Sequence, residues 1–311
     1  MKHSVSAKPY TEYWMDCVLS LMVSLVSSYS PQCADAAVMN HYEYINFGNS
    51  IWWKLLELRY SPDFYKELSS RIEVRPLDKI EEDELVPTIK SYVDSDRLLM
   101  LTTDAYHLIK NSLHYHSTHM QHGWLFNGYD DQTGSFYIFS DNIGGFGENE
   151  VTAQDFELAV IPETYTQACE LVLDKREFAY RLTLEEVRAN AAKINKSITK
   201  LSYCNFWKCH STEYTEDRCF DMSKLIGRQH ANTVLFARLC ECGLISEELC
   251  REMTERSNAL ELGWNSVRGI FLKRHIKGRV PDYAALSKKA WDLLCREYDM
   301  WTYFLETTEN R

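Results

Sequence analysis

The sequence lacks any apolar segment long enough to cross a lipid bilayer. Its most apolar run, Val18 to Val26, is too short for a membrane-spanning helix and is interrupted by serines. The first residues of the chain contain no apolar core of the kind that a secretion signal requires. We therefore expect a cytoplasmic protein that does not associate with membranes.

The sequence also lacks paired cysteines. It has 10 cysteines, but none forms a CxxC pair, and the closest two are Cys240 and Cys242. A structural zinc site usually needs two such pairs at suitable spacing. Disulfide bonds are rare in the cytosol. We therefore expect reduced thiols, no metal and no bound cofactor.

Positive charge is in deficit, and the deficit is uneven along the chain. There are 34 Lys and Arg residues against 45 Asp and Glu, a net charge of −11, which argues against a nucleic-acid partner. Residues 1–180 hold 13 basic and 27 acidic residues, a balance of −14, whereas residues 181–311 hold 21 and 18, a balance of +3. This change is consistent with two domains, 1–180 and 181–311, although two differently solvated surfaces would give the same pattern.

The hydrophobic patterns predict an α+β fold: an amino-terminal domain with an antiparallel sheet, followed by an all-helical domain. In the first domain we expect helices over 16–28, 34–39, 50–59, 81–91 and 151–158, and strands over 71–75, 97–103, 122–129, 135–140 and 176–180. The segment 42–47 is either a strand or the wall of a pocket, and the glycines of 142–147 suggest a mobile loop. In the second domain we expect long helices over 183–204, 221–242, 246–275 and 282–306.

Cys17 is a candidate nucleophile because of its expected position in the first helix. Asp16 is a plausible N-cap, which would make Cys17 the first helical residue. There the partial positive charge of the helix end lowers a thiol pKa, and backbone N–H groups point at whatever the sulfur attacks. A buried cysteine in a core helix is the alternative.

A predicted β-hairpin over 119–141 would supply the partner residues. Its first strand begins near His122, the turn spans 130–134, and the second strand ends at Asp141. Pairing of the two strands would bring the start of one beside the end of the other, so His122 and Asp141 could lie side by side. A histidine beside a carboxylate is half of a nucleophilic triad.

Polar residues at the end of the buried strand 97–103 are further site candidates. Asp104 and Tyr106 follow that strand directly, and together with Asp16 we expect them to contact substrate. Half of the chain's histidines then follow within sixteen residues: His107, His114, His116, His119 and His122. They lack an HxxxH helix and an acidic third ligand, which disfavours a metal site.

The order of these motifs resembles one family of acyltransferases, that of the butirosin-biosynthesis protein H. The matching residues are Asp16-Cys17, Asp104 to Leu108, His122 to Asp130, and Asp141. The resemblance covers about the first 160 residues and implies a papain-like cysteine-protease fold for them. The helical second half resembles the helical extension of some family members. One difference is that no glutamine precedes Cys17, although papain-type enzymes use one to stabilise the oxyanion.

The resemblance implies transfer of an acyl or peptidyl group from a carrier-protein thioester to an amine, in the biosynthesis of a specialised metabolite such as an antibiotic. Cys17 would be the nucleophile, His122 the general base and acid, and Asp141 the residue that orients the imidazole. Phosphopantetheine would enter only as the carrier's prosthetic group. The acidic carrier could dock on the basic residues of the second half, which are Arg268, Lys273, Arg274, Lys277, Arg279, Lys288 and Lys289.

Two alternatives stay open from the sequence. The same triad could use water as acceptor, which would make the protein a thioesterase, amidase or peptidase; the His-strand-Gly-Tyr-Asp pattern also occurs in peptidases that process bacteriocin leaders. Alternatively, the papain-like fold could serve only as a non-catalytic binding protein. The basic residues could equally be a solvated helix face. The acyl group, the amine and the oligomeric state are not encoded in any recognisable pattern.

Overall fold

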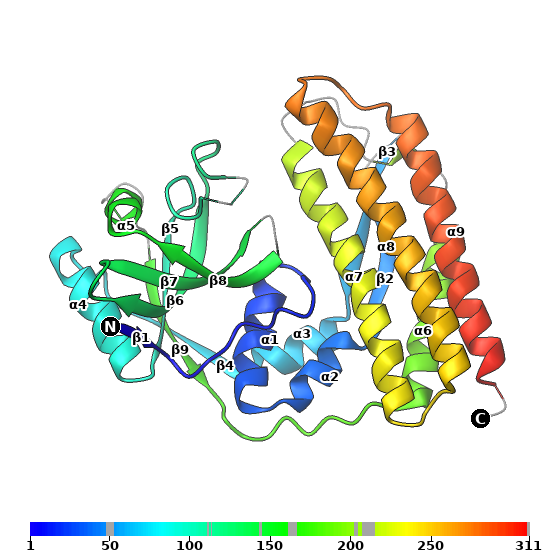
Figure 1. Cartoon of the computed structure of the whole chain (residues 1–311), viewed down its shortest axis with the longest axis horizontal. Coiled ribbons are helices and arrows are strands. Elements are labelled where there is room, and N and C mark those ends of the chain that lie inside the picture. Colours follow the sequence, from blue (N-terminus) through cyan, green and yellow to red (C-terminus); the bar gives the residue numbers. More distant parts are fainter. Residues whose placement is uncertain are drawn as a thin grey trace. The chain divides into compact units, whose positions relative to one another are not determined.

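A computed structural model of the chain describes residues 1–47, 53–110, 112, 114–142, 145–160, 167–201, 205–206 and 215–309. The chain divides into two units (Figure 1). The first, called the sheet unit here, comprises Met1–Glu12, Asp16–Ala34 and Lys66–Ala179. The second, the helical unit, comprises Tyr13–Met15, Asp35–Tyr65 and Tyr180–Arg311. The chain crosses from the sheet unit to the helical unit at residues 179–180, close to the boundary expected from the sequence. The helical unit also includes the earlier segment Asp35–Tyr65.

The sheet unit is organised around a seven-stranded antiparallel sheet. Its strand order is β4-β9-β5-β6-β7-β8, and β1 pairs with β6. The strands are β1 (Lys2–Ser4), β4 (Ile72–Pro76), β5 (Leu98–Asp104), β6 (Gln121–Asp130), β7 (Ser135–Asn142), β8 (Gly145–Val151) and β9 (Gln167–Leu173). The continuous apolar run of β5 is explained by its central position, where Leu99 and Leu101 are fully buried.

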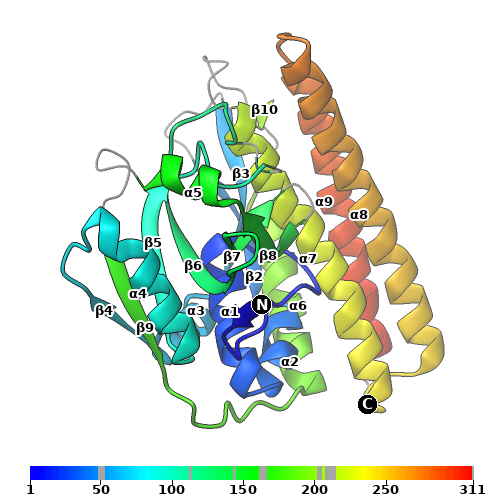
Figure 2. The same cartoon turned by 60° about the vertical axis from the view of Figure 1, so that its left-hand side comes forward.

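Helices α4 and α5 cover one face of this sheet. Helix α4 (Glu82–Asp94) has an acidic first turn, which suits its dipole, and it packs along β5 and β6 (Figure 2). Helix α5 (Ala153–Ala159) begins after Thr152, whose hydroxyl accepts a hydrogen bond from the Asp155 N–H. Its Phe156 ring contacts Phe126 of β6 and Phe136 of β7, so the aromatic residues of the hairpin form the core beneath α5.

Helix α1 (Cys17–Tyr29) also belongs to the sheet unit and contacts β7. Its buried residues include Leu19, Val23 and Leu25, in agreement with the apolar pattern of the sequence. Two short helices, α2 (Gln32–Val38) and α3 (Pro62–Ser69), lie where the chain passes between the units. Pro62 opens α3, as expected for a residue that lacks a backbone N–H.

The β6–β7 hairpin contains one irregularity that matters for the site. The strands are joined at residues 131–134, and Gly134 has a φ of 69°, a conformation that glycine adopts without strain. The pairing register changes by one residue between Phe126 and Gly128, which marks a β-bulge. At Gly128 a Cβ atom would lie 2.6 Å from the backbone oxygen of His3 in β1, so no larger residue fits there.

The helical unit contains four longer helices and a small sheet. The helices are α6 (Leu184–Lys200), α7 (Thr215–Glu241), α8 (Glu247–Ile276) and α9 (Tyr283–Thr307). The sheet has the order β10-β3-β2, formed by β2 (Tyr42–Phe47), β3 (Trp53–Tyr60) and β10 (Asn205–Phe206). Strand β2 lies at the edge of this sheet and packs beside α6. None of the helices in the described ranges is long and apolar enough to span a membrane.

A fully buried polar network ties the small sheet to the helices. Both carboxylate oxygens of Glu297 in α9 accept hydrogen bonds from tyrosine hydroxyls of β2, Tyr42 at 2.6 Å and Tyr44 at 2.7 Å. The amide of Gln229 in α7 donates a third at 2.7 Å. Arg228, also fully buried, donates to the backbone oxygens of residues 38 and 39. Residues that are far apart in the chain therefore satisfy one another's polar groups.

The structure confirms an antiparallel sheet followed by a helical carboxy-terminal part. The secondary structure predicted for several segments is wrong. The helix predicted over 50–59 is wrong, because residues 53–60 form β3. The strand predicted over 176–180 is also wrong: those residues lack regular structure, and the strand is β9, which precedes them. The predicted glycine loop over 142–147 is a strand from residue 145 onward; residues 143–144 lie outside the described part.

Candidate functional site

Cys17 is the first residue of helix α1. Asp16 precedes it in an extended conformation, and its Oδ1 accepts a hydrogen bond from the Leu19 N–H at 2.8 Å. This is the N-cap that the sequence predicts, so Cys17 lies at the positive end of the helix dipole. The Cys17 side chain is half-buried, not enclosed in the core. The position therefore suits a reactive thiolate.

His122 lies at the start of β6, where burial decides its protonation. Burial lowers the pKa of His122, whereas the negative charge of Asp141 and a hydrogen bond to the Gly123 backbone act in the opposite direction. The charge of His114 lowers the pKa further. The net result is a pKa below the usual histidine value, so the ring is neutral at neutral pH and able to accept a proton. Its Nδ1 atom is buried and has no hydrogen-bond partner among the described residues.

The side chains of His122 and Asp141 leave opposite faces of the sheet. Phe126 in β6 pairs with Ile138 in β7, and paired residues share a face. From these residues to His122 and Asp141 neither strand contains another bulge: β6 pairs with β5, and β7 pairs with β8, without a change of register. Because side chains alternate along a strand, His122 shares the face of Phe126, whereas Asp141 lies on the face opposite to that of Ile138. Asp141 therefore acts on His122 through its charge, not as a neighbour on the same face.

The β-bulge causes this arrangement. Near the turn, Tyr129 pairs with Phe136, and continuing that register without a bulge would place Trp124 opposite Asp141, on the face of His122. The extra residue shifts the register by one, which exchanges the two faces of the remaining strand. Asn142 of β7 consequently shares the face of His122.

Asn142 has the chemistry that orienting an imidazole requires. Its amide nitrogen donates a 2.6 Å hydrogen bond to Oδ1 of Asn149 in β8, and the Asn149 amide in turn donates to the Ser140 backbone oxygen at 3.1 Å. These bonds fix the orientation of the Asn142 amide. An amide oxygen is an atom that can accept a ring N–H. Some cysteine enzymes use a Cys-His-Asn arrangement of this kind. Sequence reasoning missed Asn142 because the bulge has no clear signal in the sequence.

Asp104 and Tyr106 hold the loop that precedes β6. Asp104 is buried, and it accepts hydrogen bonds from the Tyr106 and Met120 N–H groups, both at 3.0 Å, and from His119 Nδ1 at 2.5 Å. Burial alone would raise the pKa of Asp104, but these bonds outweigh it and lower the pKa. The Tyr106 ring stacks on His119 at 4.2 Å. Both predicted substrate-binding carboxylates, Asp104 and Asp16, thus accept hydrogen bonds from the backbone.

The histidine-rich segment forms ring stacks. His116 stacks on Tyr115 at 4.0 Å and lies 5.2 Å from Tyr106, whose ring meets His107 edge-on. Within the described ranges, no group of three or more His, Cys, Asp or Glu side chains could hold a metal ion.

Buried polar atoms at and beside His122 have no hydrogen-bond partner in the part of the chain that the structure describes, and they were not anticipated from the sequence. They are Oγ1 of Thr103, Nε1 of Trp124 and Nδ1 of His122. Thr103 pairs directly with His122, and Trp124 lies two residues further along β6, so all three occupy the same face. Buried polar groups are usually satisfied. This cluster is therefore a candidate region for contacting the polar part of a substrate.

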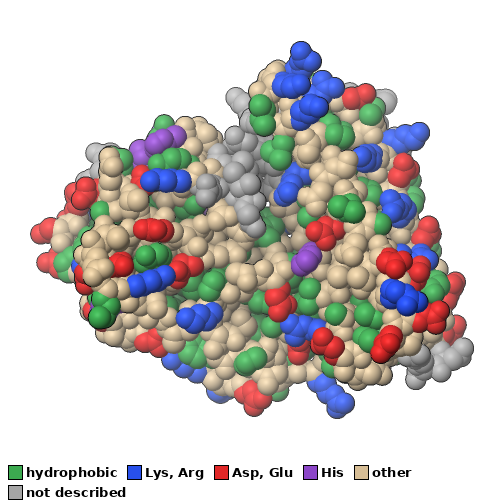
Figure 3. All heavy atoms as spheres, in the orientation of Figure 1, with side chains coloured by type: hydrophobic (Ala, Val, Ile, Leu, Met, Phe, Trp, Pro, Cys, Tyr) green, Lys and Arg blue, Asp and Glu red, His purple; other side chains and the backbone are tan. Residues whose placement is uncertain are grey.

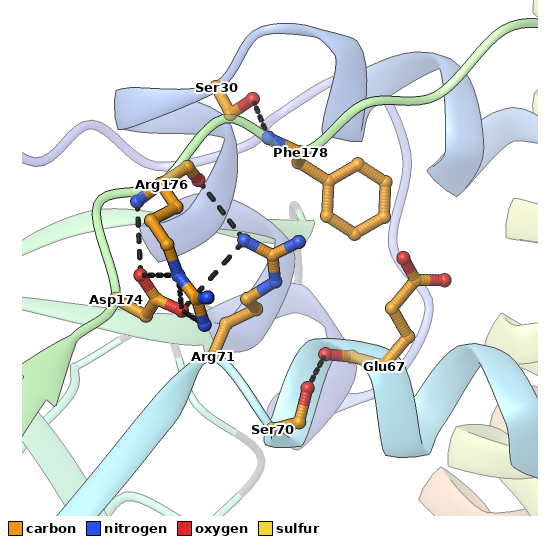
Figure 4. Close-up of polar contacts among 7 residues, drawn as sticks. All are labelled: Ser30, Glu67, Ser70, Arg71, Asp174, Arg176 and Phe178. Carbon is orange, nitrogen blue, oxygen red and sulfur yellow. Dashed lines mark hydrogen bonds and ion pairs between the residues drawn. The ribbon is translucent and has the colours of Figure 1, made fainter.

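A separate hollow in the sheet unit is lined by two arginines that both contact Asp174. It has a volume of about 400 Å³ and is lined by Glu67, Ser70, Arg71, Arg176 and Glu177. Figure 4 shows the contacts of Arg71 and Arg176 with Asp174. Arg71 donates to the Arg176 backbone oxygen at 3.1 Å, and Arg176 forms bonds of 2.5–2.9 Å with Asp174. These contacts fasten the chain after β9, and none of the candidate catalytic residues lines the hollow.

No protein-family model matches this chain, and no curated protein does either. The residues that define the candidate site thus come from the sequence and the structure alone. They are Cys17 at the start of α1 and the polar cluster around His122.

Proposed function

We propose that the protein is a cysteine-dependent acyltransferase that moves an acyl or peptidyl group from a carrier-protein thioester to an amine. The position of Cys17 carries this proposal: it is the capped first residue of a helix that packs against the hairpin bearing the histidine. A papain-like arrangement of the sheet unit belongs to the same proposal. The reaction needs no metal or bound cofactor.

In the first step, His122 accepts the proton of the Cys17 thiol, and the thiolate attacks the thioester carbonyl. The bond from that carbon to the phosphopantetheine sulfur breaks, and the departing thiolate takes the proton from His122. In the second step, the amine attacks the Cys17 thioester and gives a proton to His122. The bond between carbon and Cys17 then breaks, and the proton returns to the sulfur.

The oxyanion that forms in each step requires hydrogen-bond donors. Backbone N–H groups in the first turn of a helix point out of its end, so that of Val18 is a suitable donor. This would compensate for the missing glutamine upstream. In the same proposal, Asn142 orients the His122 ring, and the charge of Asp141 stabilises the imidazolium.

An acidic carrier would find a complementary surface at the turn between α8 and α9. Lys and Arg side chains gather there (Figure 3), and Lys273, Lys277 and Arg279 are exposed. Ile276 is 82% exposed and Val280 61% exposed between these cations, so apolar contact would accompany the charge attraction. If this surface receives the carrier, Lys277→Glu raises KM for the acyl carrier and leaves acylation by a small thioester unchanged.

The test is to incubate the protein with an acyl-loaded carrier and to measure its intact mass. We expect an acyl adduct on wild-type protein, its loss in Cys17→Ala, and its retention in Cys295→Ala, which removes an exposed thiol. Added amine should discharge the adduct as an amide, whereas release of the free acid in the presence of amine would identify a hydrolase. Absence of an adduct, with Cys17 alkylated no faster than Cys295, would leave a non-catalytic binding role.

A further inference from the structure

The helical unit contains a cavity that the proposed acyl transfer does not use. Its volume is about 570 Å³, within the usual range of small-molecule sites. Strand β2 with residues 59–62 forms one wall, and α6 with Leu201 forms the other. The lining residues are His41, Tyr42, Glu43, Tyr44, Ile45, Asn46, Arg59, Ser61, Pro62, Asn190, Lys193, Lys196, Ser197, Lys200 and Leu201.

The cavity is strongly cationic. Lys193, Lys196 and Lys200 project from α6 at spacings of three and four residues, which places them on one side of the helix. Arg59 adds a fourth positive charge from β3, and among the described residues of the lining Glu43 alone is acidic. In the part of the chain that the structure describes, none of these four cations forms an ion pair. Unpaired cations around a concave site attract and concentrate anions.

His41 in the lining is neutral, chiefly because it is buried. Burial, followed by the charges of Arg228 and Lys193, lowers the pKa of His41 to about 4. The ring therefore carries no charge at neutral pH and can serve as a hydrogen-bond donor or acceptor. Its Nδ1 lies 3.5 Å from the Asn190 amide nitrogen. The positive charge of the cavity consequently comes from side chains whose charge persists at neutral pH.

The wall formed by β2 is rigid. The Tyr44 N–H donates to the Ser197 hydroxyl at 3.0 Å, which joins the strand edge to α6. The hydroxyls of Tyr42 and Tyr44 are held by the buried Glu297 on the other side of the strand. A preformed wall reduces the entropy lost when a ligand binds.

The spacing of the lysines indicates more than one anionic group. Lys193 and Lys200 are separated by about 10 Å along the helix axis, at 1.5 Å per residue. A row of this length, with Arg59 in the same lining, can contact more than one anionic group at a time. We propose that the cavity binds a small molecule carrying two or more negative groups, phosphate or carboxylate, which the lysines of α6 and Arg59 contact by charge-assisted hydrogen bonds.

Isothermal titration of the full-length protein with inorganic pyrophosphate, and separately with citrate, tests this proposal. All titrations are made at the same ionic strength, so that screening by salt is equal for both probes. We expect saturable binding of at least one probe with a stoichiometry near one. Tighter binding of pyrophosphate identifies phosphate as the preferred group, and tighter binding of citrate identifies carboxylate.

The variant for this test is Lys193→Gln/Lys196→Gln/Lys200→Gln. Its control is Lys8→Gln/Lys79→Gln/Lys175→Gln, which removes three exposed lysines outside both the cavity and the surface proposed for the carrier. The cavity variant should raise Kd by about tenfold or more, because three charge-assisted bonds are lost, and the control should not. Arg59→Gln serves as a milder variant if the triple change affects folding. Absence of saturable binding in the wild type, or equal weakening in both triple variants, would overturn the proposal.

Discussion

Replacing Glu297 should reveal how far the helical unit depends on its buried network. The Glu297 carboxylate is fully buried and accepts hydrogen bonds from Tyr42, Tyr44 and Gln229 at 2.6–2.7 Å. Glu297→Ala leaves these three donors without their acceptor, and a buried unsatisfied group costs about 1–3 kcal/mol. Because the tyrosine hydroxyls can turn toward other acceptors, we expect a combined loss of about 3–5 kcal/mol in the free energy of unfolding.

Glu297→Gln is the milder test. It retains the shape of the side chain but turns one acceptor into a donor, so we expect a loss of about 1–2 kcal/mol. Glu306→Gln on the same helix is the control, since Glu306 is exposed and should change stability by less than about 0.5 kcal/mol. Urea unfolding followed by tryptophan fluorescence measures the free energy of unfolding of both glutamine variants. Equal stabilities of the two glutamine variants would show that the network contributes nothing.

The pH dependence of the same variant provides a second check. Burial raises the pKa of Glu297 above its ordinary value of 4.5, despite the hydrogen bonds that lower it. An acid with a raised pKa binds its proton more tightly in the folded protein, so stability is lost as pH rises from 4.5 through the raised value. Glu297→Gln cannot titrate. The stability advantage of wild type over this variant should therefore be largest at acid pH and should shrink as the pH rises.

Three further predictions concern the candidate site. Asn142→Ala should slow acylation of Cys17 by about 10- to 100-fold, as loss of an orienting partner does at other sites, whereas Asp141→Asn should slow it less; the reverse order would contradict the facial assignment. Because the pKa of His122 is lowered, the acid limb of the pH–rate profile for acylation should lie below the usual histidine pKa of about 6.5. The Asp141 charge raises this pKa, so Asp141→Asn should move the acid limb to still lower pH, and an upward shift would refute the electrostatic coupling. Asp104→Ala should increase amide hydrogen exchange across residues 105–120, because the loop loses three hydrogen bonds; unchanged exchange would show that Asp104 does not hold the loop.

Local sequence signals determined much of the fold. The four long helices of the second half follow from apolar periodicity and from caps such as Thr183, whose hydroxyl accepts from the Glu186 N–H. The position of Cys17 follows from the Asp16 cap in the same way. The hairpin follows from two strand patterns and the turn between them. In each case the deciding interactions lie within a few residues of one another.

Local signals were insufficient where a segment is compatible with two structures. The residues of β3 contain leucines that suit either a helix or a strand. Pairing with β2 decides the matter, because it buries Leu56 and Leu58 on one side and directs Arg59 outward. Tertiary contacts therefore override the helical pattern.

The sequence by itself singled out Cys17 and His122 as candidate catalytic residues and placed them near the start of a helix and of a strand. Only the tertiary structure decided which face each side chain occupies. A single bulged residue between Phe126 and Gly128 moves Asp141 to the far face and brings Asn142 to the face of His122, because strand side chains alternate with a period of two. The cationic cavity likewise arises only when β2 and α6, about 150 residues apart in the chain, pack side by side.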